Sequence, residues 1–118
     1  MEFKDKKAIY LQIANLFCEN ILQKRWVADE KIPSVREMAV ELEVNPNTAM
    51  RTYSYLQDLG IIYNKRGIGY FVAHNGFEIT QKLIKKQFVE EDLPAFFKTL
   101  KMLNMSVNEI VEINNNRK

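Results

Sequence analysis

The sequence contains only one cysteine and one histidine, and this scarcity excludes several kinds of chemistry. Cys18 cannot form a disulfide within the chain, and its place in an apolar stripe predicts a buried, unreactive thiol. With His74 as the only histidine, no metal-ligand spacing occurs. The phosphate-binding pattern G-x-x-x-x-G-K is missing as well. We therefore expect a protein that is not an enzyme and has no catalytic residues, metal ion or cofactor.

Long apolar runs and a strong charge imbalance are also missing. No run approaches the length of a membrane span, and the N-terminal residues lack the apolar core of a secretory signal. The sequence thus predicts a soluble, cytoplasmic protein without a membrane partner. Its 17 Lys and Arg stand against 15 Asp and Glu, so bulk charge does not indicate a nucleic-acid partner. If the protein binds DNA, its positive charge must be concentrated locally.

Apolar residues make up 47% of the 118 residues, which is enough for a packed core. Residues 8–23 are predicted to form the first helix, because apolar side chains recur there at spacings of three and four. These side chains are Tyr10, Ile13, Phe17 and Ile21. Trp26 follows without neighbouring aromatic residues, so we expect it to anchor the core rather than to stack on a base.

Residues 32–72 hold the most specific pattern in the chain. Ser34 and Glu37 have the spacing of a capping box, in which each side chain accepts a hydrogen bond from the other residue's amide. They predict a helix that runs to about Leu42. Arg36 lies at its first turn, beside backbone amides and the positive end of the helix dipole. This helix start is predicted to bind an anion.

A second helix is predicted after a turn at residues 43–44. Asn45 is a suitable N-cap, and Pro46 is a suitable first helical residue. Gly60 is expected to end the helix after Leu59. The amides at this start, like those of the preceding helix, are expected to face DNA phosphates. The predicted inner stripe contains Ala49, Tyr53 and Leu56. The opposite side carries polar groups for phosphates and base edges, namely Asn47, Thr48 and Arg51.

Two β-rich runs, residues 61–63 and 70–72, predict a hairpin, and residues 31–32 predict a very short strand. The hairpin loop carries two positive charges and two glycines, which permit positive φ and close backbone approach. These residues are Lys65, Arg66, Gly67 and Gly69. Two helices, a turn and a hairpin in this order make a winged helix-turn-helix, which predicts sequence-specific binding to double-stranded DNA.

The remaining residues predict two or three amphipathic helices, with a second capping box at Ser106 and Glu109 and a helix start or bend at Pro94. The expected fold is mainly α with a small hairpin. Its expected parts are a DNA-binding domain over residues 1–75 and a helical dimerisation segment over residues 76–118. That segment is too small for a core of its own, so it should pack on the first domain or on a second copy. The expected dimer contacts are Leu83, Phe88, Phe96, Phe97, Leu100 and Ile110.

Several segments together resemble one known family, and they cover about residues 8–73 with its order and spacing. They are Ile9-Tyr10-Leu11-Gln12-Ile13, Ile32-Pro33-Ser34-Val35-Arg36-Glu37-Met38-Ala39, Val44-Asn45-Pro46-Asn47-Thr48, Leu56, Gly60 and Arg66-Gly67-Ile68-Gly69-Tyr70-Phe71-Val72. This pattern resembles the GntR family of bacterial transcription regulators, and the short helical tail is most similar to its YtrA-type branch. The resemblance implies a homodimer, joined through its C-terminal helices, that represses a nearby operon from an inverted-repeat operator.

The resemblance also implies which residues contact DNA. Arg36 and the turn from Asn45 to Thr48 would contact the operator, and the glycine-bearing hairpin would enter the adjacent minor groove. Many relatives have an arginine where Pro46 stands, and Arg51, one turn later, is expected to compensate. The candidate DNA-binding residues are Ser34, Arg36, Asn45, Asn47, Thr48, Arg51, Lys65, Arg66, Gly67 and Gly69.

Lys24 and Asp29 replace two glycines that relatives have after the first helix, which leaves the end of that helix open. Two further alternatives remain. A winged helix can serve protein-protein contact without operator binding, and the arginine-bearing surface would then be dispensable. A small-molecule effector, if one is sensed, would have to fit between the two domains or at the dimer contact.

Overall fold

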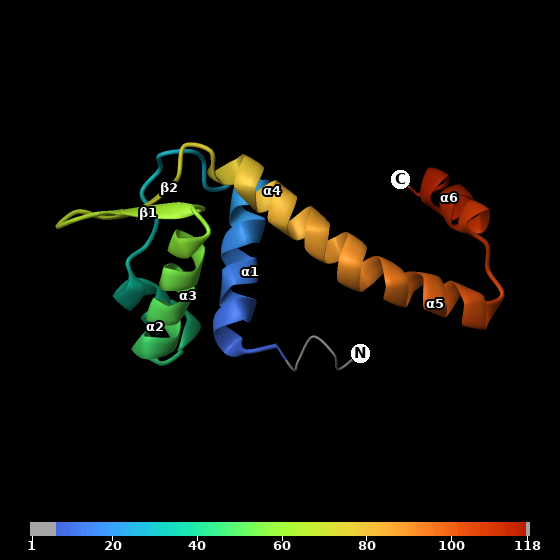
Figure 1. Ribbon diagram of the computed structural model, residues 1–118, viewed down its shortest axis with the longest axis horizontal. Helices are drawn as coiled ribbons and strands as arrows, with labels where there is room; N and C mark the ends of the chain where they lie inside the picture. The colour runs from blue at the N-terminus through green and yellow to red at the C-terminus, as the bar shows by residue number, and fades with distance from the viewer. Residues whose placement is uncertain (1–6, 118) are drawn as a thin grey trace. The chain divides into compact units, whose positions relative to one another are not determined.

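The computed structural model describes residues 7–117 as six helices, a π-helical turn and one hairpin (Figure 1). The elements are α1 (Ile9–Leu22), α2 (Val35–Leu42), α3 (Pro46–Asp58), β1 (Ile62–Lys65), β2 (Gly69–Val72), α4 (Gly76–Gln87), η2 (Phe88–Asp92), α5 (Leu93–Leu103) and α6 (Val107–Asn115). The predicted fold class, mainly α with a small hairpin, is confirmed. None of the helices within residues 7–117 has the length and hydrophobicity that a membrane span requires.

The first compact unit extends to Lys82 and is built on α1, α2 and α3. α3 packs against both α1 and α2 (Figure 1). Phe17 lies at the centre, with its ring edge-to-face against Trp26 at 5.0 Å and against Tyr53 at 5.2 Å. Trp26 is therefore a core anchor, as predicted. Cys18 is buried, and burial raises the pKa of its thiol to about 11, which fits the predicted unreactive state.

The predicted helix starts are confirmed in atomic detail. The Glu37 amide donates to Ser34 Oγ at 3.1 Å, and the Ser34 amide donates to Glu37 Oε1 at 2.8 Å, so α2 begins with a complete capping box. α3 begins with Asn45 as N-cap and Pro46 in the first turn. Gly60 follows its end with φ +82°, a conformation that side-chain-bearing residues adopt only at a cost.

The hairpin pairs β1 with β2 in antiparallel register, from Ile62 opposite Val72 to Lys65 opposite Gly69. Lys31 forms a bridge to Phe71, and the Ile32 amide donates to the Tyr70 carbonyl at 2.9 Å, so the predicted very short strand joins the hairpin. Because Ile32 is two residues before the N-cap of α2, this pairing places the start of α2 beside the hairpin.

The connection after α1 contains Lys24 and Asp29, the two positions where the family resemblance implies glycine. Lys24 and Asp29 both have left-handed backbone conformations there, with φ of 62° and 65°. Asp29 is held by Tyr63, whose hydroxyl donates to Oδ1 at 3.2 Å, and by His74, whose Nδ1 lies 3.1 Å from Oδ2. These hydrogen bonds lower the pKa of Asp29, and the one with His74 contributes most. The chain thus keeps a glycine-type backbone at both positions, and α1 ends at Leu22.

The first turns of α4 belong to the same unit. Gly76 is buried, and a Cβ there would lie 2.9 Å from the Ile61 carbonyl oxygen, so only glycine fits this close approach. Thr80, one turn later, is fully buried. The sequence predicts a domain boundary after residue 75. In the structure the first turns of α4 pack on the hairpin, and the two compact units divide between Lys82 and Leu83.

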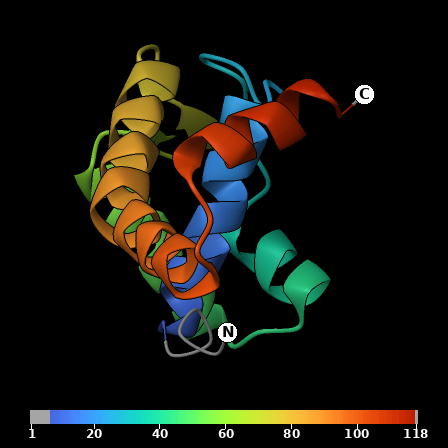
Figure 2. The same cartoon turned by 90° about the vertical axis from the view of Figure 1, so that its right-hand side faces the viewer.

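The second unit, residues 83–117, contains η2, α5 and α6. Pro94 stands in the first turn of α5, directly after the π-helical turn. Because proline has no amide to donate to the carbonyl four residues earlier, the regular α-helical hydrogen bonding is interrupted at this point. The chain turns after α5 at Asn104, which has a left-handed conformation, and α6 begins at the predicted capping box of Ser106 and Glu109 (Figure 2). The only buried side chain within residues 83–117 is Leu100, which is 6% exposed.

Candidate nucleic-acid interface

The outer side of α3 forms a continuous exposed stripe. Its inner side is buried, as predicted, with Thr52 in addition to the predicted stripe. The exposed side chains recur at spacings of three and four, and they are Asn47, Met50, Arg51, Ser54 and Asp58. The predicted residues do not include Met50, which is 40% exposed, Ser54 or Asp58, although their spacing from Asn47 marks the same helix side. We call these five residues the α3 outer stripe. It offers amide, thioether, guanidinium and hydroxyl groups on one helix side, and it ends at the carboxylate of Asp58.

The start of α2 carries a free positive charge. Arg36 is exposed, and within residues 7–117 its side chain has no hydrogen-bond or ion-pair partner. The capping box occupies the Ser34 and Glu37 amides and leaves those of Val35 and Arg36 free. A hydrogen bond from the Ser34 amide lowers the pKa of Glu37, so an ionised carboxylate lies at the same turn. The predicted anion site is therefore limited to two amides and the Arg36 guanidinium.

The start of α3 differs from the expectation that its amides face phosphates. Asn45 Oδ1 accepts from the Asn47 amide at 2.7 Å, and the Asn45 carbonyl accepts from the Thr48 amide at 2.9 Å. Pro46 has no amide to offer. The amides of this first turn are thus satisfied within the chain, and the expectation is wrong for α3. Any contact that this turn makes with DNA must come from its side chains.

Tyr53 fixes α2 against α3. Its hydroxyl, at the inner side of α3, donates to the Pro33 carbonyl at 2.5 Å and lies 3.2 Å from the Ser34 carbonyl oxygen. Burial raises the pKa of Tyr53, so the hydroxyl keeps its proton and remains a donor. Sequence reasoning placed Tyr53 in the core but missed this link, because both acceptors are backbone groups far away in the chain. The link holds the turn that carries Arg36 in a fixed position relative to α3.

Arg51 does not extend freely from the α3 outer stripe. Its guanidinium carbon lies 4.1 Å from the centre of the Tyr10 ring, a cation–π distance. Tyr10 belongs to the first turn of α1 and was predicted only as a core residue. The side chain of Arg51 remains exposed, so its N–H groups are accessible at the edge of this stack.

The hairpin tip combines positive charge with an open backbone. Arg66 is exposed, and Lys65 Nζ lies 4.9 Å from the centre of the Phe71 ring. Gly67 has φ +78° and no atom within 4 Å of a Cβ built there, so its backbone is open to close approach. Gly69 has φ +143°, and a Cβ there would lie 3.0 Å from Lys31 Cε. Lys31 therefore adds a third cation to the hairpin, which sequence reasoning missed because it lies outside the loop.

All ten predicted DNA-binding residues lie in the first unit, and the structure sorts them into three groups: the start of α2, the first two turns of α3, and the hairpin tip. The pairing of residues 31–32 with β2 brings the start of α2 and the hairpin together. Ser34 and Asn45 use their side-chain oxygens as helix caps, and Thr48 is half-buried. Arg36, Asn47, Arg66 and Gly67 are exposed. Arg51 and Lys65 are exposed as well, each with its cation over an aromatic ring.

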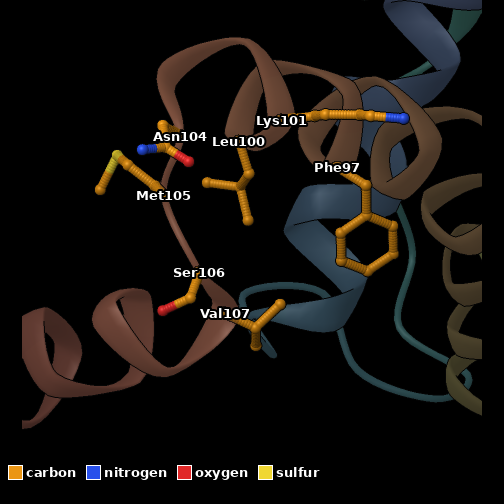
Figure 3. Close-up of a pocket in the computed structure, with 7 residues that line it drawn as sticks. All are labelled: Phe97, Leu100, Lys101, Asn104, Met105, Ser106 and Val107. Atoms are coloured by element: carbon orange, nitrogen blue, oxygen red, sulfur yellow. The ribbon is translucent and has the colours of Figure 1, made fainter.

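The six predicted dimer residues all lie in the second unit, with uneven exposure. Phe88, Phe96 and Phe97 are exposed, Leu83 and Ile110 are half-buried, and Leu100 is only 6% exposed. An open groove of about 440 Å³ lies where α5 turns into α6 (Figure 3). Phe97, Leu100 and Val107 point into the space between the two helices there. Further exposed apolar residues that were not predicted as contacts are Val89, Met102, Leu103, Val107, Val111 and Ile113.

Comparisons with known proteins identify relatives over nearly the whole chain. The family described as "Bacterial regulatory proteins, gntR family" matches residues 9–72. The HTH-type transcriptional regulator YhcF of Bacillus subtilis is 41% identical over 111 residues, which are 94% of this chain and 90% of YhcF. The HTH-type transcriptional repressor YtrA of the same organism is 33% identical over 93 residues, which are 75% of this chain and 72% of YtrA.

Solved structures show the same fold. A GntR-family transcriptional regulator from Bacteroides thetaiotaomicron is 46% identical and superposes with a TM-score of 0.73, covering 92% of this chain and 94% of that chain. The DNA-binding domain of AraR, solved in complex with its operator ORX1, is 27% identical with a TM-score of 0.57 and covers 59% of this chain and 84% of that chain. The AraR match thus concerns the DNA-binding part alone.

Proposed function

Because the chain belongs to the GntR family and is thus a DNA-binding transcriptional regulator, we propose that it represses transcription as a homodimer on an inverted-repeat operator. The YtrA-type relationship supports the direction of regulation, since the Bacillus subtilis relative is a repressor. A dimer bound across a promoter in the cytoplasm would exclude RNA polymerase from that DNA. The relatives are regulators rather than enzymes, so the site is interpreted as a binding surface.

The observation that carries the proposal is the placement of three exposed polar groups on the first compact unit. The α3 outer stripe lies on the second helix of the helix-turn-helix, the position of a recognition helix for the major groove, with Asn47 and Arg51 as donors to base edges or phosphates. Arg36 and the two free amides beside it suit a phosphate. The hairpin tip, with its open backbone at Gly67, suits the adjacent minor groove.

Local charge supports the same interpretation in a chain whose net charge is only +2. No ion pair to an acidic side chain within residues 7–117 occupies the cations of this surface, so their charge remains available for phosphates. These cations are Lys31, Arg36, Arg51, Lys65 and Arg66. Phosphate contacts of this kind would supply affinity, and the α3 outer stripe would supply sequence preference.

The homodimer proposal is supported by the apolar surface of residues 83–117. Phe88 and Phe97 are 49% and 48% exposed, and α6 exposes Val111 and Ile113 on a short helix with no buried residue. Exposed apolar residues in this number mark an interaction surface. A second copy would cover them and bring two DNA-binding units to two half-sites, where the second contact gains from effective concentration.

Gel retardation with DNA from upstream of the protein's own coding sequence tests the function. We expect a specific complex that unrelated DNA of equal length does not displace. Hydroxyl-radical footprinting of that complex should show two protected half-sites about one or two helical turns apart. Absence of any specific complex, at any salt concentration, would favour the alternative of a winged helix that serves protein-protein contact.

The dimer is tested separately by sedimentation. Phe97→Glu should shift the protein toward monomer, because a charge would replace an apolar side chain at the proposed contact. The matched control is Thr99→Glu, which adds the same single charge at an exposed polar position of the same helix turn. A Phe97→Glu variant that sediments like the wild type would contradict the proposed contact.

A further inference from the structure

Tyr10 and Arg51 form a stack between two elements that the sequence does not connect. Tyr10 lies in the first turn of α1, and Arg51 lies in the second turn of α3. The guanidinium carbon is 4.1 Å from the ring centre. α1 and α3 are neighbouring helices (Figure 1), so this stack joins two packed elements.

Tyr10 is itself held firmly by α3. The Thr52 hydroxyl, which is fully buried, donates to the Tyr10 carbonyl at 2.8 Å. The Tyr55 ring meets the Tyr10 ring edge-on, with centres 5.9 Å apart and an angle of 77° between the planes. Backbone and ring of Tyr10 are therefore both fixed against the recognition helix. The ring is a rigid platform on which the exposed Arg51 rests.

Arg51 has no substitute on its helix. It is the only lysine or arginine from Pro46 to Asp58, and Pro46 at the helix start carries no donor. A guanidinium stacked on a ring covers one face and keeps all five N–H donors free in its plane. The stack thus restricts the long side chain of Arg51 without using its hydrogen-bonding capacity.

We propose that Tyr10 is a positioning residue for DNA binding, whose ring orders Arg51 on the α3 outer stripe before DNA arrives. This inference rests on the proposed function. Its physical basis is the entropy that a flexible side chain loses when it is immobilised at an interface. Because Tyr10 already restricts Arg51 in the free protein, less of that entropy is lost on binding. Removal of the ring should weaken binding about two- to tenfold per half-site.

A double-mutant cycle on DNA affinity tests the inference, with a duplex that the wild-type protein selects from a random-sequence pool. Tyr10→Leu should weaken binding of this duplex about two- to tenfold per half-site. Tyr10→Phe, which keeps the ring, should bind the duplex with wild-type affinity. In an Arg51→Ala background, Tyr10→Leu should have no further effect. The matched control uses Lys65→Ala, a substitution on the hairpin, as the background in place of Arg51→Ala. In that background Tyr10→Leu should weaken binding as much as it does in the wild-type protein.

The free protein supplies a second readout. In NMR spectra the side-chain protons of Arg51 should be shifted upfield by the ring current, and this shift should vanish in Tyr10→Leu but remain in Tyr10→Phe. Equal effects of Tyr10→Leu with and without Arg51 would overturn the inference, as would an Arg51 spectrum that Tyr10→Leu leaves unchanged. If the pool yields no enriched duplex, the proposed function fails and the inference falls with it. Enrichment combined with an additive cycle removes only the role of Tyr10.

Discussion

Removal of one oxygen atom, in Tyr53→Phe, tests the link between α2 and α3. The Tyr53 hydroxyl is the group that joins the inner side of α3 to the Pro33 carbonyl, at 2.5 Å. The Ser34 carbonyl oxygen, 3.2 Å away, also accepts from the Met38 amide and therefore stays hydrogen-bonded in the variant. The substitution thus leaves one carbonyl, that of Pro33, without its partner.

The expected cost follows from this count. An acceptor left unsatisfied in a partly buried place lowers the free energy of unfolding by about 1–2 kcal/mol. For a unit of this size, such a loss lowers the melting temperature by roughly 4–16 °C. Because the same hydroxyl fixes the turn that carries Arg36, DNA affinity at a temperature well below melting should fall as well.

Thermal unfolding followed by circular dichroism, at fixed protein concentration, measures the stability change. The control is Tyr63→Phe, which removes an exposed hydroxyl that donates to Asp29 at 3.2 Å and should have a much smaller effect. A Tyr53→Phe variant as stable as the wild type would refute the assigned role of the hydroxyl. A variant that loses stability but binds DNA normally would refute the positional link to Arg36.

Three further outcomes are expected. Arg36→Ala should weaken operator binding by about 1–3 kcal/mol while the melting temperature stays normal, and unchanged affinity would remove Arg36 from the site. Lys24→Gly should raise the free energy of unfolding by up to about 1 kcal/mol, because glycine relieves a left-handed backbone at some cost in entropy; Lys24→Ala keeps that strain and should not stabilise. Cys18, with its buried thiol of pKa about 11, should react with a thiol reagent at pH 8 only at the rate of unfolding, and fast labelling of the native protein would contradict its burial.

The parts of this structure that sequence reasoning predicted are those fixed by local chemistry. The capping box of Ser34 and Glu37, with its second instance at Ser106, depends on groups three residues apart, so spacing alone reveals it. The glycine stop at Gly60 and the hairpin are local in the same sense. Such features place the helices and thereby the outer side of α3.

The parts that were missed depend on contacts between distant segments. Nothing near Tyr53 in the sequence indicates that its hydroxyl reaches Pro33, and nothing near Arg51 indicates the Tyr10 ring. The same holds for Lys31, whose place beside Gly69 results from strand pairing. Leu100 is one of the predicted dimer contacts, yet it is buried within its own chain, because periodicity marks an apolar helix side without showing which of its residues the same chain covers.

The most direct test of the central claim, that this surface binds operator DNA through locally concentrated charge, is the salt dependence of DNA affinity. The logarithm of the binding constant should fall linearly with the logarithm of salt concentration, with a slope of about −0.9 for each phosphate neutralised. A dimer that uses several cations in each copy should therefore give a steep slope, and Arg36→Ala should make it shallower. A specific complex whose affinity barely changes with salt, or whose slope is the same in Arg36→Ala, would contradict the account.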